Sequence, residues 1–369
     1  MILKNLNVTD VVNIIKIRGE LKMNKSKLFR LTVLTTVTIL IFMACFLNGY
    51  ADVKEFRWGT SSTGSSGHRA LVALTTLLDR EMENYNFTVL PTPGAVFTVK
   101  KYAMEEMDGL YGADVAFYEL SGNVDRFEGF SSQIKRYPVQ SFWAYTLEVG
   151  LAIHANNMEK FKGWRDLSGE KVFTGPAAWD VRAALERPLK VLNVGHKYVE
   201  IDLGMVSSSL GAGHISAINA YTSGGGSTIS PWLMETELGT DIAILNPSEE
   251  EIELLKKAGI EVVDIQPDVF ETDVHVDVIK GVPFFYGFHT GPEVMPEEDV
   301  YQMLKVIEEN AAELAKQDPI YRQIQENMVD IQLRGIKATI DFVQVHPGLA
   351  RYLREKGVWN SDWDDQIAK

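Results

Sequence analysis

The chain is poor in cysteine, in clustered histidine and in positive charge, and each shortage excludes a class of protein. Its single cysteine, Cys45, lies in an apolar run near the N-terminus, so the rest of the chain has no disulfide bond and no thiol chemistry. The seven histidines are scattered without a His-x-x-x-His pair, so we expect neither a metal nor a cofactor. The net charge of −14 argues against a nucleic-acid partner, because phosphate binding needs a basic surface.

Residues 31–47 form an uncharged apolar segment with the features of a secretory signal peptide. Three basic residues between positions 25 and 30 precede it. Gly49-Tyr50-Ala51 follows it and places small residues at positions −3 and −1 of a cut before Asp52. We therefore expect residues 1–51 to be removed on export and the mature protein to be periplasmic.

Three alternatives for this N-terminus stay open. Residues 1–22 belong to an over-called start if translation begins at Met23. The apolar run would be an uncleaved anchor, although it is shorter than the roughly 20 residues that a spanning helix needs. A lipid on Cys45 would tether the protein; Ala44 fits a lipoprotein cut, but Phe42 stands where Leu is preferred.

After Asp52, apolar patterns with the periods of strands and helices alternate, which predicts an α/β fold with parallel strands and right-handed crossovers. The first predicted set comprises strands at Phe56–Gly59, Asn86–Leu90 and Ala113–Tyr118 and helices at His68–Glu83 and Val96–Met107. A second set of strands is predicted at Lys171–Thr174, Tyr198–Ile201, Ile215–Tyr221, Asp241–Leu245 and Glu261–Ile265. Two long strands, Ser141–His154 and Val276–His289, are expected to cross between the sets. The prediction is therefore two lobes, residues 52–154 with 271–369 and residues 155–270, with a hinge and a ligand cleft between them.

The first candidate site is the loop Gly59–His68 (GTSSTGSSGH), between a predicted strand and the helix that follows it. A helix N-terminus has unpaired N–H groups and partial positive charge, so it suits an anion. Gly59 and Gly64 have the spacing of a P-loop, but serines stand where Lys and Ser/Thr are required. A helix cap needs one hydroxyl and this loop offers five after Thr60, which favours ligand binding over capping alone. The residues predicted to bind ligand here are Thr60, Ser61, Ser62, Gly64, Ser65, Ser66, Gly67 and His68.

Two loops in the second set of elements are further candidates. Thr222–Ser230 (TSGGGSTIS) either closes on the ligand, with Tyr221 and Gly225, or is a flexible surface loop. Thr174–Arg182 (TGPAAWDVR) contains Trp179, which is either packed core or a platform for the ligand. Arg182 either binds a carboxylate through its planar guanidinium or pairs with a neighbouring acidic residue.

Catalysis is less well supported than binding. Ser66 and His68 are neighbours in sequence, but a nucleophile and its base must meet in space. The chain has no Gly-x-Ser-x-Gly elbow. A binding protein rather than an enzyme is therefore expected. The rival hypotheses are an envelope hydrolase using Ser65 or Ser66 and a receptor that presents its ligand to a sensor kinase.

Four segments, in this order behind the predicted signal peptide, resemble the TAXI family of solute receptors for TRAP (tripartite ATP-independent periplasmic) transporters. They are Trp58–Gly67, Thr92–Val96, Ala113–Ala116 and the His-Pro-Gly-x-x-Arg-Tyr pattern at His346–Tyr352, of which the last is the most specific. The resemblance covers essentially residues 56–360. It implies a type II periplasmic-binding-protein fold whose two lobes close on a small organic anion and deliver it to an integral-membrane TRAP permease.

The resemblance also suggests site residues and a ligand class. Thr60–Gly67 would hold the ligand carboxylate, Glu119 stands where a Gln is common, and the loop containing Gly175 would face it from the second lobe. Glutamate, glutamine or 2-oxoglutarate would be usual ligands. Where the family has a Ser-Gly-Thr run at the start of the second-lobe helix, this chain has Trp179-Asp180-Val181. That departure, with the extra carboxylate of Glu119, argues against an amino-acid dicarboxylate and favours an aromatic or branched monocarboxylate.

Overall fold

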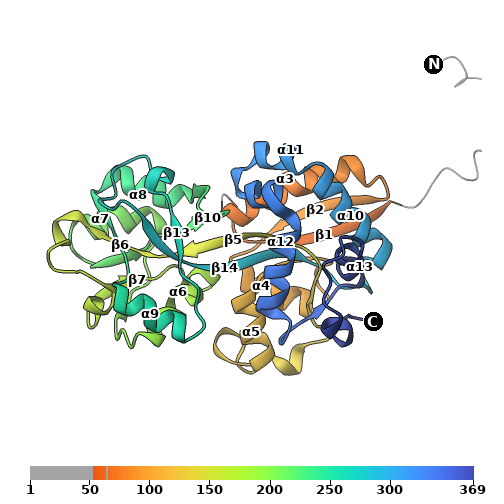
Figure 1. The fold of residues 1–369 in the computed structure, drawn as a ribbon, viewed down its shortest axis with the longest axis horizontal. Coiled ribbons are helices and arrows are strands. Elements are labelled where there is room, and N and C mark those ends of the chain that lie inside the picture. Colours follow the sequence, from red (N-terminus) through yellow and green to blue (C-terminus); the bar gives the residue numbers. More distant parts are fainter. Residues whose placement is uncertain (1–52, 64) are drawn as a thin grey trace, which may run out of the picture. The chain divides into compact units, whose positions relative to one another are not determined.

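The computed structural model describes residues 53–63 and 65–369 (Figure 1). The predicted signal peptide, Cys45 and Gly64 lie outside these residues. Lys54–Lys369 form one compact structural unit.

The first part of this unit alternates strand and helix, as predicted. Its elements are β1 (Lys54–Thr60), α3 (Ser66–Glu81), β2 (Tyr85–Pro91), α4 (Ala95–Ala103), β3 (Leu110–Ala113) and α5 (Asp114–Gly122). β1 and β2 pair in parallel along their whole length, from Lys54–Tyr85 to Thr60–Pro91. Parallel strands need a crossover connection, because the chain must return to the same end of the sheet, and α3 supplies it.

One predicted strand is wrong. Ala113–Tyr118 was expected to be a buried strand, but the strand ends at Ala113 and Asp114 begins helix α5. A short apolar run fits a buried helix as well as a strand, so its period does not decide between them. The Asp114 carboxylate accepts a hydrogen bond from the Val115 amide over 2.6 Å, which satisfies an amide that the first helical turn leaves unpaired.

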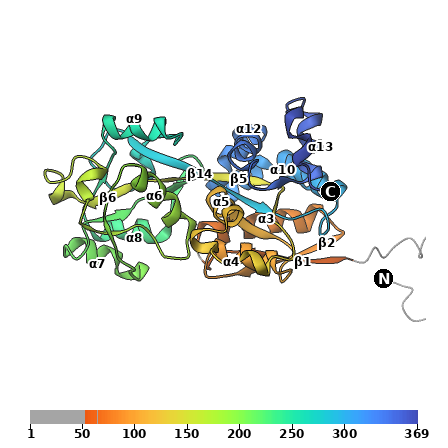
Figure 2. The same cartoon turned by 90° about the horizontal axis from the view of Figure 1, so that it is seen from below.

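Two antiparallel strands, β5 (Trp143–Val149) and β14 (Ile279–His289), lie side by side in both views (Figures 1 and 2). They form a sheet of order β11-β10-β5-β14-β13, and β3 also pairs with β14. The remaining members are β10 (Thr222–Ser223), β11 (Thr228–Ile229) and β13 (Val263–Ile265). The long strand predicted at Ser141–His154 is divided at Gly150, and its second half, β6 (Leu151–His154), continues into another sheet.

That second sheet has five strands in the order β12-β6-β9-β7-β8. Its strands are β7 (Lys171–Phe173), β8 (Lys197–Tyr198), β9 (Ala217–Asn219), β12 (Ile242–Leu245) and β6. The helices of this part are α6 (Asp180–Val191), α7 (Val206–Gly211), α8 (Pro231–Gly239) and α9 (Glu249–Lys257). The predicted strand at Glu261–Ile265 pairs with β14 and so belongs to the other sheet.

The C-terminal part is helical, with α10 (Glu297–Glu309), α11 (Ala311–Gln317), α12 (Arg322–Thr339) and α13 (Pro347–Glu355). β4 (Val139–Gln140) and β15 (Gln344–Val345) form a short parallel pair. The 3-10 turns lie at Asp125–Phe127, Ser131–Gln133, Ala155–Asn157, Trp164–Leu167, Leu203–Met205, Pro267–Val269, Pro319–Tyr321 and Ser361–Gln366. The His-Pro-Gly motif begins α13: His346 Nδ1 accepts from the Gly348 amide at 3.0 Å and its Nε2 lies 2.9 Å from the Met295 carbonyl oxygen.

An aromatic cluster fixes the end of β1 from which the candidate site begins. The Trp58 ring packs against Phe56, Phe87 and Phe288, with centroids 5.0, 5.8 and 6.1 Å apart. Its indole Nε1 donates to the Leu110 carbonyl over 3.2 Å. Buried aromatic rings contribute much of the free energy of folding, so the strand that leads into the loop at Thr60 is held rigidly.

The predicted fold class, an α/β fold with two lobes joined by crossing strands, is confirmed by this strand order. The division of the chain at residues 154 and 270 stays a prediction.

Candidate ligand-binding site

The loop between β1 and α3 is closed by two of its serines. Ser65 is the N-cap of α3, and its hydroxyl accepts a hydrogen bond from the His68 amide at 3.2 Å. The hydroxyls of Ser61 and Ser65 are 2.6 Å apart. Ser65 therefore has the capping role that was the alternative to ligand binding, and Ser61 supports it.

Two other hydroxyls of this segment are buried without a partner. Thr60 Oγ1 and Ser66 Oγ make no hydrogen bond to any residue that the structure describes. Both residues are buried, Thr60 at the end of β1 and Ser66 in the first turn of α3. Buried hydroxyls nearly always have a partner, and exceptions indicate water, an ion or a ligand. Their position at a helix N-terminus suits an anion.

Arg69 lies in the same helical turn and was missed by the sequence analysis. Its Nε and Nη2 are buried without a hydrogen-bond partner among residues 53–63 and 65–369, and Nε is 3.7 Å from Asp318. Burial raises the pKa values of Tyr145 and Tyr221, and the positive charge of Arg69 opposes both shifts. The positive charge of Arg69 therefore acts on both tyrosines and adds to the partial positive charge at the N-terminus of α3.

Three tyrosines from separate strands form the wall beside this helix. The hydroxyls of Tyr111 and Tyr145 are 2.7 Å apart, and the rings of Tyr111 and Tyr286 stack with centroids 4.3 Å apart. A Cβ at Gly67 would lie 2.5 Å from the Tyr111 ring. Gly67 is thus needed so that α3 can approach this wall, which is a packing role.

Tyr221 lies directly before β10, the short strand that pairs with β5. It is buried, and Trp232 Nε1 donates to its hydroxyl at 3.3 Å. Ser230, the N-cap of α8, has a buried hydroxyl that interacts with the Tyr221 hydroxyl and opposes the rise in its pKa. Tyr221 was predicted to contact ligand, and its position near Arg69 is compatible with that role.

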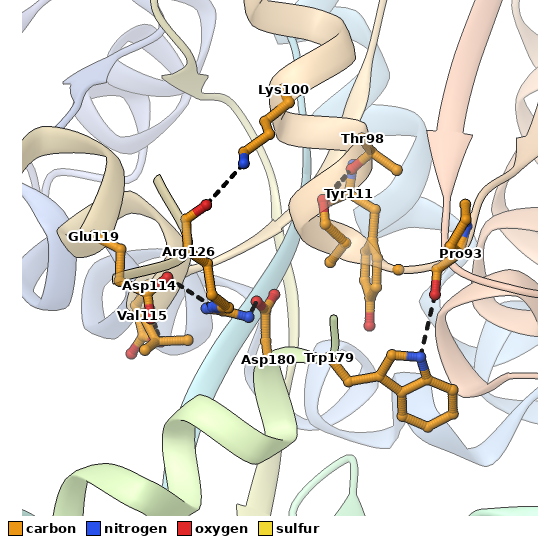
Figure 3. Close-up of polar contacts among 12 residues, drawn as sticks. Pro93, Thr98, Lys100, Tyr111, Asp114, Val115, Glu119, Arg126, Trp179 and Asp180 are labelled. Carbon is orange, nitrogen blue, oxygen red and sulfur yellow. Dashed lines mark hydrogen bonds and ion pairs between the residues drawn. The ribbon is translucent and has the colours of Figure 1, made fainter. Parts of the chain in front are cut away.

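An ion-pair cluster links the lobes (Figure 3). Arg126 Nε donates to Glu119 Oε2 at 2.7 Å, and its Nη1 donates to Asp180 Oδ1 at 2.6 Å. The side chains are 14%, 5% and 0% exposed respectively, so the ions are shielded from water. Glu119 was predicted to bind ligand, but its carboxylate is held by Arg126. Burial raises its pKa, and Arg126 opposes the shift.

The second-lobe loop that contains Trp179 contacts the first lobe directly. Trp179 Nε1 donates to the Pro93 carbonyl at 3.2 Å, as Figure 3 shows. A Cβ at Gly94 would lie 2.8 Å from the Ala178 carbonyl oxygen, so this glycine permits the close approach. Trp179 therefore has a role in lobe contact that needs no ligand.

Two predicted residues of the same loop take structural roles. Gly175 has φ +115°, a conformation that side chains rarely adopt, and its carbonyl accepts from the Tyr198 hydroxyl. Arg182 stacks on the Tyr198 ring, 3.9 Å from its centroid, and lies 3.9 Å from Glu186. The alternative interpretation of Arg182, pairing with a neighbouring acidic residue, fits these contacts.

The glycine-rich loop after Tyr221 binds a carboxylate of the protein itself. The amides of Gly225 and Gly226 donate to Glu148 at 3.2 and 3.1 Å, and Thr222 Oγ1 donates at 2.6 Å. The hydroxyl of Thr146 makes a further short contact. Gly225 was predicted to bind ligand, but its amide is used by Glu148 on the crossing strand β5.

The serine and histidine considered for hydrolysis are not brought together. His68 lines a surface hollow of about 460 Å³ with Arg69, Gln317 and Asp318, and Ser66 is buried. Ser62, also predicted to bind ligand, is partly exposed in the loop.

Two features are absent from the residues that the structure describes. Among residues 53–63 and 65–369, no three His, Cys, Asp or Glu side chains are grouped so that they could hold a metal ion. Within the same ranges, no helix combines the length and apolarity that crossing a bilayer requires.

Comparison with known proteins gives a family. A model described as the NMT1-like family matches residues 58–357. No curated protein matches the chain. Among solved structures, the periplasmic aliphatic sulphonate binding protein SsuA from Escherichia coli is 11% identical, with 82% of this chain and 83% of that chain covered and a TM-score of 0.41.

Two further structures are similar at the same level. The alkanesulfonate-binding protein SsuA from Xanthomonas axonopodis pv. citri, bound to MOPS, is 10% identical, with coverages of 85% and 98% and a TM-score of 0.41. The GluR0 ligand-binding core with L-glutamate is 11% identical, with coverages of 72% and 98% and a TM-score of 0.43. At these TM-scores the similarities say nothing about what this chain binds.

The family match extends over most of the chain, and it includes the loop at α3, the lobe contacts and the His-Pro-Gly motif. The chain thus belongs to the NMT1-like family, the family with which TAXI receptors are associated.

Proposed function

We propose that this protein captures a small organic anion at the N-terminus of α3 and delivers it to an integral-membrane permease of the TRAP type. The ligand carboxylate accepts hydrogen bonds from Thr60, Ser66 and the first-turn amides of α3, and Arg69 supplies charge. Tyr145 and Tyr221 line the same place from the crossing strand and the second lobe.

The observation that supports this proposal is the set of buried donors without acceptors. Thr60 Oγ1, Ser66 Oγ and two nitrogens of Arg69 have no hydrogen-bond partner in the described residues, and the nearest anion to Arg69 Nε is Asp318 at 3.7 Å. A carboxylate accepts through two oxygens with about four lone-pair sites, so one group can satisfy several of these donors. Leaving a buried donor unpaired costs roughly 1–3 kcal/mol, and a bound anion removes that cost.

The proposal includes export and lobe closure. The signal peptide predicted at residues 1–51 would bring the protein to the periplasm, where intact-mass analysis should find a chain that begins at Asp52. A lipid adduct on Cys45 would instead make it a tethered receptor. In the closed form, the Trp179–Pro93 and Arg126–Asp180 contacts would hold the lobes together around the ligand.

A thermal-shift screen of organic acids and amino acids tests the binding function. The chain from Asp52 contains the whole unit Lys54–Lys369. An acid present at a hundredfold excess over its dissociation constant should stabilise it by about 2.7 kcal/mol. If no acid of any kind raises the melting temperature, the binding function is wrong. Turnover of a hit would instead favour the hydrolase.

The transport role needs a separate experiment. Proteoliposomes that contain the TRAP permease of the same organism should take up the bound acid only when this protein is added. Uptake at the same rate without the protein would contradict delivery while leaving ligand binding intact.

A further inference from the structure

Arg69 occupies a place in α3 where a positive charge is unfavourable. The first turn of a helix carries partial positive charge and favours acidic side chains. Residues 66–69, which form the first turn of α3, contain no acidic residue and include Arg69. A cation in this position needs a compensating negative charge, either from the protein or from a ligand.

Asp318 supplies a negative charge from a distant part of the chain. Its Oδ2 lies 3.7 Å from Arg69 Nε, and this is the one ion pair that Arg69 makes among residues 53–63 and 65–369. The contact is electrostatic rather than a hydrogen bond, because Nε has no hydrogen-bond partner within those residues. Asp318 therefore balances the charge of Arg69 without using its donors.

The position of Asp318 is fixed by the turn that it begins. Asp318 is the N-cap of the 3-10 turn Pro319–Tyr321, and its Oδ1 accepts from the Ile320 amide at 3.2 Å. The hydroxyl of Tyr321, in the same turn, donates to the Ala70 carbonyl of α3 at 2.7 Å. Because Ala70 is the residue after the cation, this bond holds the carboxylate beside the guanidinium.

The two members of the pair differ in their freedom to move. The side chain of Arg69 is 41% exposed and that of Asp318 is 7% exposed. Both line the surface hollow of about 460 Å³ that His68 also borders. The hollow gives the guanidinium room to shift, whereas the capping bond holds the carboxylate in place. A solute can therefore draw Arg69 away from Asp318, but only against their mutual attraction.

The charge of Asp318 also acts on a tyrosine that lines the proposed anion site. Tyr145 is that residue, and its ionised form would itself be an anion there. Burial raises the pKa of Tyr145, and the negative charge of Asp318 adds to the rise. The positive charge of Arg69 opposes the rise by a smaller amount. An anion beside Tyr145 is thus repelled by Asp318 as well as attracted by Arg69.

We propose that Asp318 is a built-in counter-ion that competes with the anionic solute for Arg69 and thereby lowers the affinity of the site. This inference rests on the proposed function, in which Arg69 supplies charge to the bound carboxylate. A receptor that delivers its solute must also release it, and a competing carboxylate on the protein favours release. Asp318 thus sets the affinity through its charge and not through a contact with the solute.

Calorimetry on Asp318→Asn tests the inference. The probes are L-glutamate, 2-oxoglutarate, phenylpyruvate and 4-methyl-2-oxopentanoate, titrated into the chain from Asp52. Asn keeps an oxygen that can accept from the Ile320 amide but carries no charge, so the turn should stay capped. Every probe that binds the wild type should bind the variant roughly tenfold more tightly, because one nearby negative charge has been removed.

Three other variants complete the experiment. Asp318→Glu keeps the charge, so it should not raise the affinity. Asp318→Ser removes the charge but can still cap the turn, and it provides a second test if Asp318→Asn does not fold. Asp202→Asn is the matched control, because Asp202 also caps a 3-10 turn and accepts from the amide two residues later, that of Gly204, at 3.0 Å. It should leave the affinity unchanged.

Two results would overturn the inference: equal or weaker binding by the folded Asn or Ser variant, or an equal gain of affinity in Asp318→Glu. Weaker binding would show that Asp318 positions Arg69 instead of competing for it. If probes bind the wild type and the uncharged variant gains nothing, the counter-ion role alone is wrong and the proposed function stands. If no probe binds either protein, the anion site at α3 is contradicted and the inference fails with it.

Discussion

Two neighbouring serines at the start of α3 should respond oppositely to removal of their hydroxyls. Ser65 Oγ caps the helix by accepting from the His68 amide at 3.2 Å and also contacts Ser61 Oγ at 2.6 Å. Ser65→Ala should therefore lower the free energy of unfolding by about 1 kcal/mol, within a range of roughly 0.5–2. For a unit of this size, that loss corresponds to a fall in melting temperature of about 2 °C.

The Ser66 hydroxyl makes no hydrogen bond within the described residues although the residue is only 5% exposed. Ser66→Ala removes a buried hydroxyl that lacks a partner, so the melting temperature of the ligand-free protein should stay the same or rise. A hydrogen bond to a charged ligand contributes roughly 1.5–3 kcal/mol, so affinity for the bound acid should fall about tenfold to a hundredfold.

The assay combines melting curves without ligand and calorimetry with the acid that stabilises the wild type most. Ser131→Ala is a matched control, because Ser131 is exposed and far in sequence from the loop. It should change neither quantity. If Ser66→Ala lowers the melting temperature as much as Ser65→Ala and leaves affinity unchanged, Ser66 is structural and the anion site lies elsewhere.

Three further predictions follow from buried groups. Arg126→Met should weaken ligand binding about tenfold to a hundredfold, because closure would then bury the Asp180 carboxylate without its cation. In an Asp180→Asn background this loss of affinity should be smaller, and equal losses in both backgrounds of a double-mutant cycle would contradict the prediction. Glu148→Ala should lower the free energy of unfolding, measured with urea, by at least about 3 kcal/mol, because the hydroxyl of Thr222 and the amides of the glycine loop lose their acceptor. A loss below about 1 kcal/mol would show that these donors bind water instead. Burial lowers the pKa of His346 to about 4, so as the pH falls below about 6.5 this histidine takes up a proton in the unfolded chain before it does so in the folded protein. The free energy of unfolding should therefore fall by up to about 3 kcal/mol between pH 6.5 and 4, and by less in His346→Asn; an identical pH profile for the two proteins would refute the assignment.

Local patterns in the sequence predicted those elements of the fold whose structure depends on residues close together in the chain. The parallel strands β1 and β2 and the helix between them follow from apolar periodicity and a serine cap. The loop at Thr60–His68 was identified because hydroxyls and glycine before a helix have a limited set of uses. Its division into capping and unpartnered hydroxyls was not predictable, since either serine has the chemistry for both roles.

Tertiary structure decided the rest, because those interactions join residues that are distant in sequence. Arg126 and Asp180 are 54 positions apart, and neither is marked by a motif. Gly225 donates to Glu148 across 77 positions, so a loop that was one candidate for binding solute is occupied by the protein's own carboxylate. Ala113–Tyr118 became mostly helix because a short buried apolar run is compatible with either structure until its neighbours pack. The residues that could contact a solute from the second lobe are thus set by how the lobes meet, and no single segment of the sequence contains that information.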